Sequence, residues 1–435
     1  MGDANKIARK IYSGFVSSDR ISGLPEELRC KILSYLNAEE AVRASILSSI
    51  WKDMWMIMPQ ILLSDESSLG CTESSPEIAR FKFITLVDLT LARHKGTLDT
   101  ISIELRKRNY DDDELGRWVD MLSEKKPLGI AIKLPKFTVH MIPSSLFLIG
   151  GLERLHLERC IIRLPPTFEG FQLLKVLKLE SFFSADDSDI SKLISNSPLL
   201  GTLVLDDIFN TSFLNIRAEA LHTLVVKGYF DYLHLHAPNL THACFVAHNY
   251  FEDYESDPVQ DGFEDYLEQA FGSLVRIKTL SVNYRFLMYL SKGNLLTKLP
   301  GALGHLTTIT IEGCLQNRAE LLAACALFQN APMLRELEIW SQNLIGEDII
   351  FNENPRFDED YSNIEAPTLD RLVTIIFHDF MALECEIALL GSLLSWAPAL
   401  EEVKIDVDKR MMGQCICKET EKLLALPRAS TKAKI

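Results

Sequence analysis

The sequence predicts an α/β protein, in which a short N-terminal helical element precedes an irregular repeat solenoid with a parallel sheet on its concave face. Two observations support this prediction. A Leu-x-x-Leu-x-Leu pattern recurs a dozen times at intervals of 19 to 38 residues, which indicates internal repetition. Before several copies, a proline ends a helical run and pushes its neighbour toward extended geometry. Units of helix, turn and short strand stack into such a solenoid.

Residues 19–58 are predicted to form three short helices. Pro25 suits the first helical position, because the N–H that it lacks has no partner there, and two acids follow in the positive first turn. Asn37 ends this helix and, with Glu40, provides a cap for the second. The three apolar stripes are Leu28, Ile32, Leu33 and Leu36, then Val42 and Ile46, then Ile50, Trp51, Met54, Trp55 and Met58.

This stretch has more large apolar residues than so small a bundle can cover. A bundle of this size also buries too little apolar surface to offset its own conformational entropy. The surplus therefore predicts a partner protein. The alternative is that the three helices form the first layer of a larger helical domain.

Residues 19–22, 24–28, 32–36, 41–45, 47–48 and 51–55 resemble the F-box of the plant F-box/FBD/leucine-rich-repeat protein family. In that family the F-box docks on a Skp-type adaptor, which joins it to a cullin–RING ubiquitin ligase. The resemblance places the adaptor-binding positions at Leu24, Pro25, Leu28, Ile32, Leu33, Val42, Leu47 and Trp51. One departure is Ile50, where the family usually has an arginine before the first tryptophan.

The composition limits the class of partner. The formal net charge of −15 argues against nucleic acid or a membrane, since nucleic acids and anionic lipids reward basic patches. The nine cysteines are scattered and odd in number, so we expect free thiols in a reducing compartment, the cytoplasm and/or the nucleus. No apolar run approaches the roughly 18 residues that a bilayer span needs.

We expect five segments: a flexible tail (residues 1–18), the F-box (19–63), the leucine-rich-repeat solenoid (64–359), an FBD-like terminal repeat or cap (360–418) and a frayed tail (419–435). Residues 60–77, rich in serine, predict a linker, and residues 81–91 predict a helix. The repeat copies begin at Leu98, Pro127, Leu152, Leu174, Leu200, Leu221, Leu240, Ile277, Leu306, Leu334, Leu372 and Leu400.

Proline marks four of the repeat boundaries. Pro198, Pro238, Pro332 and Pro398 each stand two residues before a strand copy. Helical runs at residues 190–195, 318–329 and 384–395 precede three of them. We therefore expect a helix, a proline turn and a strand in each of these units.

Two acidic segments interrupt the repeats. Residues 251–268 carry eight acids and no lysine or arginine, and residues 347–360 carry six acids with only Arg356. The simpler interpretation is a pair of solvated surface loops. The functional alternative is that they help to bind a basic client segment, as long loops on a solenoid can.

The C-terminal stretch, residues 366–408, carries a second resemblance. The residues that resemble the FBD module, which closes many plant F-box/repeat proteins, are Phe380, Glu386, Leu389, Leu393, Leu394, Ala397, Pro398, Leu400 and Glu401. Physically, Ile387, Leu390, Leu393 and Leu394 form one apolar helix face, which would pack on the last strand as a terminal cap does.

No enzyme motif is present: the sequence has no phosphate-binding glycine loop, dinucleotide-binding turn, zinc-protease pair or nucleophile elbow. His234, His236 and His242 leave a metal site as an alternative, but without nearby cysteines or paired carboxylates we expect ordinary imidazoles, and no metal or cofactor. Cys160, Cys244 and Cys325 have no base beside them in sequence. The acid runs at Asp111 and Asp186 suit helix caps.

The F-box resemblance implies a non-catalytic substrate-recognition adaptor of an SCF-type ubiquitin ligase. Its F-box binds the Skp-type adaptor, and through it a cullin, while the repeats bind an unidentified client protein. Because the client is held close to the activated ubiquitin thioester, proximity alone accelerates its modification. The alternative is a repeat scaffold for a protein or small ligand outside the ubiquitin system, with the helical trio as its N-terminal cap.

Overall fold

The computed structural model contains two compact units, Met1–Leu152 and Glu153–Ile435, each of which is described by itself. The N-terminal tail, Leu47, both acidic segments and residues 415–417 lie outside the described residues. The structure describes residues 20–46, 48–66, 75–106, 110–136, 140–208, 213–228, 230, 232–247, 273–284, 286–287, 303–313, 318–341, 367–408 and 423–434.

The first unit begins with three helical elements, as the apolar stripes predict. They are α2 (Glu26–Leu33), α3 (Ala38–Ala44) and η1 (Met54–Ile57), and η1 is a single 3-10 turn instead of an α-helix. Asp53 has a φ of +63°, in the left-handed region, so a right-handed helix cannot run through it into η1. Asn37 caps α3 as predicted, because its Oδ1 accepts the Glu40 N–H at 2.9 Å.

The predicted linker at residues 60–77 is wrong at both ends. Gln60–Ser64 forms strand β1, which pairs in parallel with β2 (Thr100–Glu104), and β2 pairs with β3 (Gly129–Lys133). Met58, Ile61 and Leu63 are a further copy of the repeat pattern, and each is at most 4% exposed. The repeats therefore begin inside the boundary predicted for the F-box.

Helices cover one side of these first strands. Ser75 Oγ accepts the Ile78 N–H at 3.3 Å and so caps α4 (Pro76–Arg93), which contains the predicted helix. Asp111 is the N-cap of α5 (Asp112–Lys125), where Glu114 Oε2 accepts the Asp111 N–H at 3.1 Å. The unit ends with β4 (His140–Met141) and the 3-10 helix η2 (Ser144–Leu148).

The second unit contains ten parallel strands of one sheet among its described residues, in chain order across that sheet. Neighbouring strands keep one register: Leu177 lies opposite Leu155 and Leu203, and Ile375 lies opposite Leu337 and Val403. The strands are β5 (Arg154–Glu158), β7 (Val176–Glu180), β9 (Thr202–Ile208), β11 (Thr223–Gly228), β13 (His242–Ala247), β14 (Thr279–Asn283), β15 (Thr308–Glu312), β16 (Glu336–Trp340), β17 (Thr374–Phe380) and β18 (Glu402–Val407).

Ten of the twelve predicted repeat copies lead into these strands, and the copies at Leu98 and Pro127 lead into β2 and β3, so the repeat assignment is confirmed. Within each strand the apolar positions point into the core and alternate with residues on the opposite face. Leu174, Leu177 and Leu179 are each 0% exposed, and even the weak copy keeps Ala243 at 4%. Burial of these rows holds adjacent repeats together.

The proline turns have a common geometry. In each, the N–H two residues after the proline donates to the carbonyl of the residue before it, as for Leu200 to Ser197 and Leu400 to Ala397, both within 3.3 Å. The turns at Leu240 and Leu334 repeat this bond. The fixed φ of proline favours such a turn, which directs the chain into the next strand.

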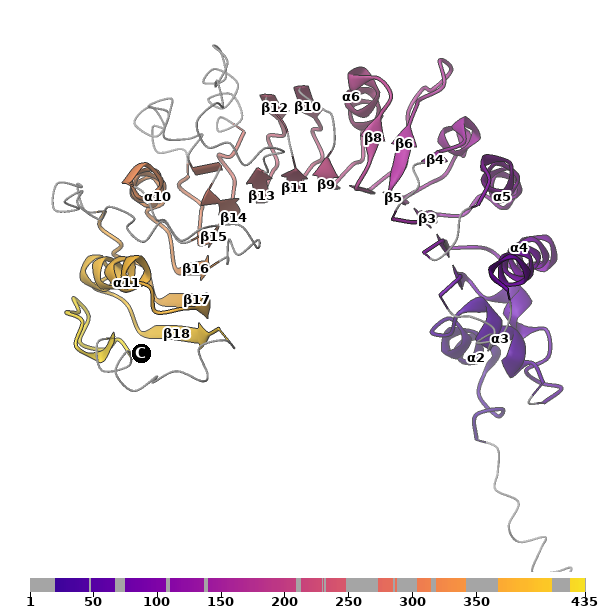
Figure 1. Ribbon diagram of the computed structural model, residues 1–435, viewed down its shortest axis with the longest axis horizontal. Coiled ribbons are helices and arrows are strands. Elements are labelled where there is room, and N and C mark those ends of the chain that lie inside the picture. The colour runs from indigo at the N-terminus through magenta and orange to yellow at the C-terminus, as the bar shows by residue number, and fades with distance from the viewer. Residues whose placement is uncertain are drawn as a thin grey trace, which may run out of the picture. The chain divides into compact units, whose positions relative to one another are not determined.

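The outer layer of the second unit is irregular. Figure 1 shows its sheet strands side by side, with helices α6 (Asp187–Ser195), α10 (Arg318–Gln329) and α11 (Glu384–Trp396) on their outer side. Two small parallel pairs also lie outside the large sheet, β6 (Cys160–Ile162) with β8 (Phe183–Ser184), and β10 (Phe213–Arg217) with β12 (Tyr232–His236). None of the helices in the described ranges is both long and apolar enough to cross a membrane.

Helix α11 packs as the predicted terminal cap. Leu390, Leu393 and Leu394 are each 0% exposed. Glu386 is buried as well, and its Oε2 accepts the N–H groups of Met381 and Leu383 at 3.1 and 2.9 Å. Burial raises the pKa of Glu386, although its hydrogen bonds oppose the shift. A carboxylate thus fixes the loop that leads into the helix.

The predicted frayed tail is wrong for residues 423–434. The Val403 N–H donates to the Lys434 carbonyl at 2.7 Å, and the Lys434 N–H donates to Glu401 at 3.0 Å. Ser430 Oγ donates to the Leu400 carbonyl at 2.6 Å. The basic charge of this segment suggests a solvated end, but its backbone bonds to the start of the last strand.

Candidate functional site

The helical elements before β1 share a small apolar core. Cys30 and Leu33 of α2, Ala41 of α3, and Trp51, Met54, Trp55 and Met58 around η1 form it. Leu33 and Met58 are each 1% exposed. The sequence folds this way because the inward stripe of each element meets the others, while α2 and α3 are too short to cover every apolar residue they carry.

Two residues predicted to bind the adaptor lie inside this core. Leu33 is buried, and Trp51 is only 7% exposed, with its Nε1–H donating to Ser22 Oγ at 2.8 Å. Neither side chain offers a free surface in this structure. The helical stripe predicted that both residues are apolar positions of a helix, but it did not distinguish the inward side from the outward side.

The outward side of α2 carries exposed apolar side chains instead. Leu28 is 49% exposed and Ile32 is 40% exposed, and both lie on one helix face because they are four residues apart. Tyr35, just after the helix, is 81% exposed. Arg29 Nη1 donates to the Ile50 carbonyl at 3.2 Å, which brings Ile50, 48% exposed, beside this helix.

We call the exposed residues Leu28, Ile32, Tyr35, Ile46 and Ile50 the exposed F-box face. Ile46 is the most exposed of them at 84%. Only Leu28 and Ile32 were predicted as site residues. Tyr35, Ile46 and Ile50 stand beside predicted positions in the sequence, so a longer apolar list for the same stretch would have included them.

The remaining predicted positions are divided. Pro25 is exposed at the start of α2, and Leu24 is half-buried. Val42 packs partly against the core of the helical trio. Leu47 lies outside the described residues. Of the eight predicted residues, Leu28, Ile32 and Pro25 are therefore the ones that the described chain exposes.

The helical trio is bonded to the repeats that follow it. His94, at the end of α4, is buried and its Nε2–H donates to the Met58 carbonyl at 2.9 Å. Burial lowers the pKa of His94, and the nearby Lys125 acts in the same direction. The Lys95 N–H also donates to the Met56 carbonyl at 2.7 Å. These bonds fix the end of the trio on α4.

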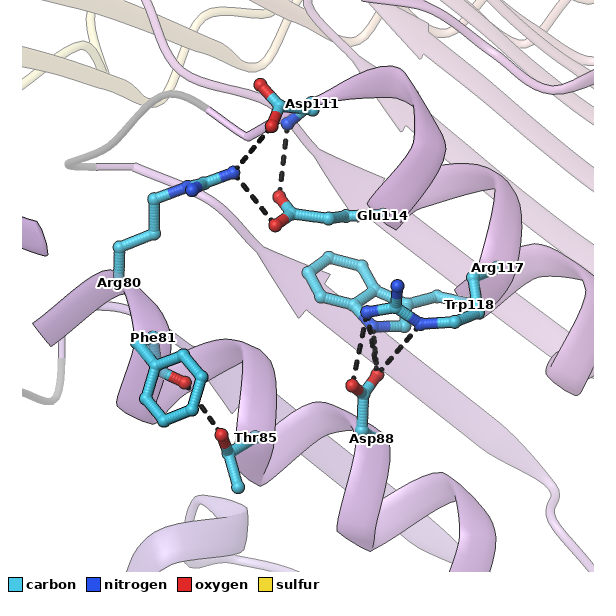
Figure 2. Close-up of polar contacts among 8 residues, drawn as sticks. All are labelled: Arg80, Phe81, Thr85, Asp88, Asp111, Glu114, Arg117 and Trp118. Carbon is cyan, nitrogen blue, oxygen red and sulfur yellow. Dashed lines mark hydrogen bonds and ion pairs between the residues drawn. The ribbon is translucent and has the colours of Figure 1, made fainter. Parts of the chain in front are cut away.

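Ion pairs join α4 to α5 in the same unit (Figure 2). Arg80 Nη2 lies 2.9 Å from Asp111 Oδ2 and 2.8 Å from Glu114 Oε1. Further along, Asp88 accepts from Arg117 and, at 2.8 Å, from the indole N–H of the buried Trp118. Phe81 lies on the exposed side of α4 and is 70% exposed. The two helices are thus held in register without using Phe81.

The predicted candidates for chemistry do not assemble. His234 Nδ1 is 2.9 Å from Asn215 Oδ1, and His236 Nε2 is 2.9 Å from Glu219 Oε1, so the two histidines of β12 have separate partners. His242 instead contacts Thr241 Oγ1 through its Nδ1, at 2.8 Å. The three imidazoles therefore do not converge on one metal.

A different group has ligand spacing: the side-chain ligand atoms of His156, Glu158 and Glu180 lie within 4.8 Å of one another. Arg159 forms an ion pair with Glu158, and His156 Nε2 lies 3.1 Å from Glu180 Oε1. Each carboxylate thus has a protein partner already. This group carries no metal assignment.

The four cysteines whose side chains the structure describes are poor nucleophiles. Burial raises the pKa of Cys160 and of Cys244, and raises that of Cys325 to about 12. Cys30 is shifted upward as well, mainly by burial. A thiol whose pKa is raised in this way carries little thiolate near neutral pH.

Comparison with known proteins identifies both parts of the chain. A family model of the F-box domain matches residues 21–60, and a model described as "FBD-associated F-box protein At5g56370, LRR repeats" matches residues 115–258. The chain carries an F-box followed by leucine-rich repeats. The F-box is the helical trio whose core and exposed face are described above.

Relatives from Arabidopsis thaliana extend the similarity. F-box/FBD/LRR-repeat protein At1g13570 is 26% identical over 431 residues, which cover 96% of this chain and 98% of that protein. Putative F-box/FBD/LRR-repeat protein At4g00315 is 26% identical over 363 residues, 74% of this chain and 78% of its own length. The resemblance to plant F-box/FBD/leucine-rich-repeat proteins is confirmed, and so is the predicted fold class.

Proposed function

We propose that this F-box protein is the substrate-recognition subunit of an SCF-type ubiquitin ligase. The F-box binds a Skp-type adaptor and through it a cullin, and the repeats hold a client protein for ubiquitination. The subunit itself is non-catalytic, since its task is to raise the effective concentration of client lysines near the activated ubiquitin. The proposal includes a cytoplasmic or nuclear location, which the four unpaired thiols among the described cysteines support.

One observation carries the proposal: the F-box closes its own core and still exposes apolar side chains. A helical layer that merely caps a solenoid has a polar outer face. The exposed F-box face has Leu28, Ile32 and Ile50 each at 40% or more exposure, together with Tyr35 and Ile46. Exposed apolar side chains on one helix face, as Leu28 and Ile32 are, are typical of a protein-binding surface.

The bonds between the F-box and α4 support the same function. A client held by the repeats is positioned only if the F-box does not swing freely relative to the first repeats. His94 and Lys95 bond directly to Met58 and Met56, and the repeat pattern begins at Met58 itself. The structure therefore leaves no linker between the F-box and β1.

The test is capture of the full-length chain on an immobilised Skp-type adaptor. We expect saturable binding that falls at least tenfold in the variant Leu28→Asp with Ile32→Asp, because two charges would be desolvated in the interface. Trp51 is left intact, because its loss would damage the F-box core. The matched control is Ile78→Asp with Phe81→Asp on α4, where both side chains are also exposed, at 51% and 70%.

The control should bind as the wild type does. Retained binding by the Leu28 and Ile32 variant would overturn the proposal. Equal loss in both variants would show non-specific apolar capture. If the wild-type chain fails to bind, the F-box is a solenoid cap and the protein acts outside the ubiquitin system.

A further inference from the structure

The outward face of β15, β16, β17 and β18 combines an exposed tryptophan with carboxylates. Leu337 and Ile339 of β16 point into the core at 0% and 1% exposure, so the residues between and beside them, Glu336, Glu338 and Trp340, lie on the opposite face. Trp340 is 39% exposed. We call the outward residues of these four strands the Trp340 face.

The indole of Trp340 is held in a fixed orientation. Its ring stacks on His378 of β17, with the centroids 4.0 Å apart and an angle of 21° between the planes. His378 Nδ1 in turn lies 3.0 Å from Asp406 Oδ2 of β18, so the carboxylate orients the imidazole. A fixed aromatic side chain loses little conformational entropy on binding, which favours affinity.

Acids surround this indole. Glu312 of β15 lies opposite Trp340 in the register, and Glu338 stands two residues before it on the same face. Glu338 accepts a hydrogen bond from Thr310 Oγ1 at 3.3 Å. The four strands present five carboxylates outward and one lysine, Lys404, which already pairs with Glu402 at 3.1 Å.

The excess of acids over basic residues does not extend to the first strands of this unit. On β5 and β7 the outward residues mix the two signs: Arg154, His156 and Lys178 alternate with Glu158 and Glu180. No aromatic side chain stands on the outward face of those two strands. The acidic character together with an exposed indole therefore distinguishes β15–β18 from β5 and β7.

We propose that the Trp340 face binds an arginine-bearing, extended segment of the client. The inference rests on the proposed function, since it names the chemistry of the client that the repeats hold. A cation placed over the open face of an indole is attracted by its π-electrons, and tryptophan is the best such partner. The guanidinium also stacks flat on aromatic rings and pairs with carboxylates through two N–H groups, which an ammonium cannot match.

The test uses the full-length chain and a defined probe, a fluorescein-labelled 12-residue peptide of Gly-Ser-Arg repeats. Fluorescence anisotropy measures its binding at low and at moderate salt. We expect binding that weakens with salt, because the charges on this face are exposed. We expect Trp340→Ala to weaken it about threefold or more, and Glu338→Gln to weaken it without removing any aromatic contact.

Matched controls separate this site from general attraction to an acidic protein. Asp206→Asn on β9 also removes one outward carboxylate of the same sheet, but at a distance from Trp340 in the strand order. A peptide of Gly-Ser-Glu repeats controls for sequence-independent contact, and thermal unfolding checks that Trp340→Ala is folded. If that variant is unfolded, Trp340→Phe, which keeps a ring with weaker cation attraction, takes its place with Glu338→Gln.

Three results would overturn the inference: unchanged binding in Trp340→Ala, equal weakening by Asp206→Asn and Glu338→Gln, or equal binding of the acidic peptide. The experiment is separable from the test of the proposed function. The Leu28 and Ile32 variant should bind the arginine peptide normally, and Trp340→Ala should bind the Skp-type adaptor normally. Loss of adaptor capture with intact peptide binding would refute the ligase role and leave the Trp340 face standing.

Discussion

Two helices, α2 near the start of the described chain and α11 near its end, differ in whether their apolar side chains are buried. Helix α2 of the F-box leaves Leu28 and Ile32 at 49% and 40% exposure. Helix α11 has Leu390, Leu393 and Leu394 at 0%. Both helices carry large apolar side chains, for which the sequence predicts a partner protein in α2 and packing on the last strand in α11.

The difference teaches what a terminal element of a repeat protein does. Helix α11 is completed by its own chain, since it covers the last strands and the segment 423–434 covers it in turn, with the Ala429 N–H donating to the Leu394 carbonyl at 3.0 Å. The F-box buries its own apolar core but leaves Leu28 and Ile32 exposed on its surface. A cap closes the chain, whereas a docking module keeps an apolar face for another protein.

The largest loss of stability should come from substituting a buried leucine of α11. Leu393→Ala removes a side chain with 0% exposure from the core under α11. We expect it to lower the free energy of unfolding by about 2–5 kcal/mol, the usual cost of such a cavity. Urea unfolding followed by circular dichroism measures it. A loss below about 1 kcal/mol would contradict the assignment of α11 as a packed cap.

Glu386 should give an intermediate effect. Glu386→Ala leaves the N–H groups of Met381 and Leu383 without their acceptor, which we expect to cost about 1–3 kcal/mol. Because burial raises the folded pKa of this carboxyl above its ordinary 4.5, the folded state binds the proton more tightly than the unfolded state does. Stability from this group is therefore present at low pH and lost as pH rises through the folded pKa.

Glu386→Gln isolates the pH term, because glutamine does not ionise. We compare the unfolding free energies of wild type and Glu386→Gln from pH 4 upward. The value for the wild type should fall relative to that of the variant as pH rises. A difference that stays constant with pH would show that the carboxyl titrates alike in both states.

The smallest loss of stability should come from substituting the exposed side chains of α2. Leu28→Ala with Ile32→Ala removes apolar side chains that the described chain does not bury, so we expect the unfolding free energy to stay within about 0.5 kcal/mol of wild type. The same urea titration measures it. Destabilisation comparable to that of Leu393→Ala would place these residues in a core and remove the contrast between α2 and α11.

The repeat array was largely predictable from the sequence. Leucine at two fixed spacings and proline two residues before a strand fix both the strand and its inward face, so Leu200 and Leu400 were placed correctly along with their turns. The copy at Met58, Ile61 and Leu63 was missed because methionine and isoleucine replace leucine there, and the serine-rich residues beyond it indicated a linker.

The candidate site was only partly predictable. Helical spacing shows which residues are apolar neighbours, but the direction in which each points depends on how α2 meets α3 and η1. Leu33 and Trp51 therefore fell inside, and Tyr35 and Ile46 outside. The Trp340 face was not predicted, because Trp340, His378 and Asp406 lie on three different strands and meet only through the sheet register.

The segment 423–434 has a consequence for self-association of the chain. The last strand of a sheet presents N–H and C=O groups that can recruit a strand from another molecule. On β18 the Val403 N–H is already bonded to the Lys434 carbonyl, and Lys434 pairs in parallel with Glu402. Two copies of the chain would have to displace this segment before they could join through β18. The segment 423–434 thereby protects the start of β18 from pairing with a strand of a second copy.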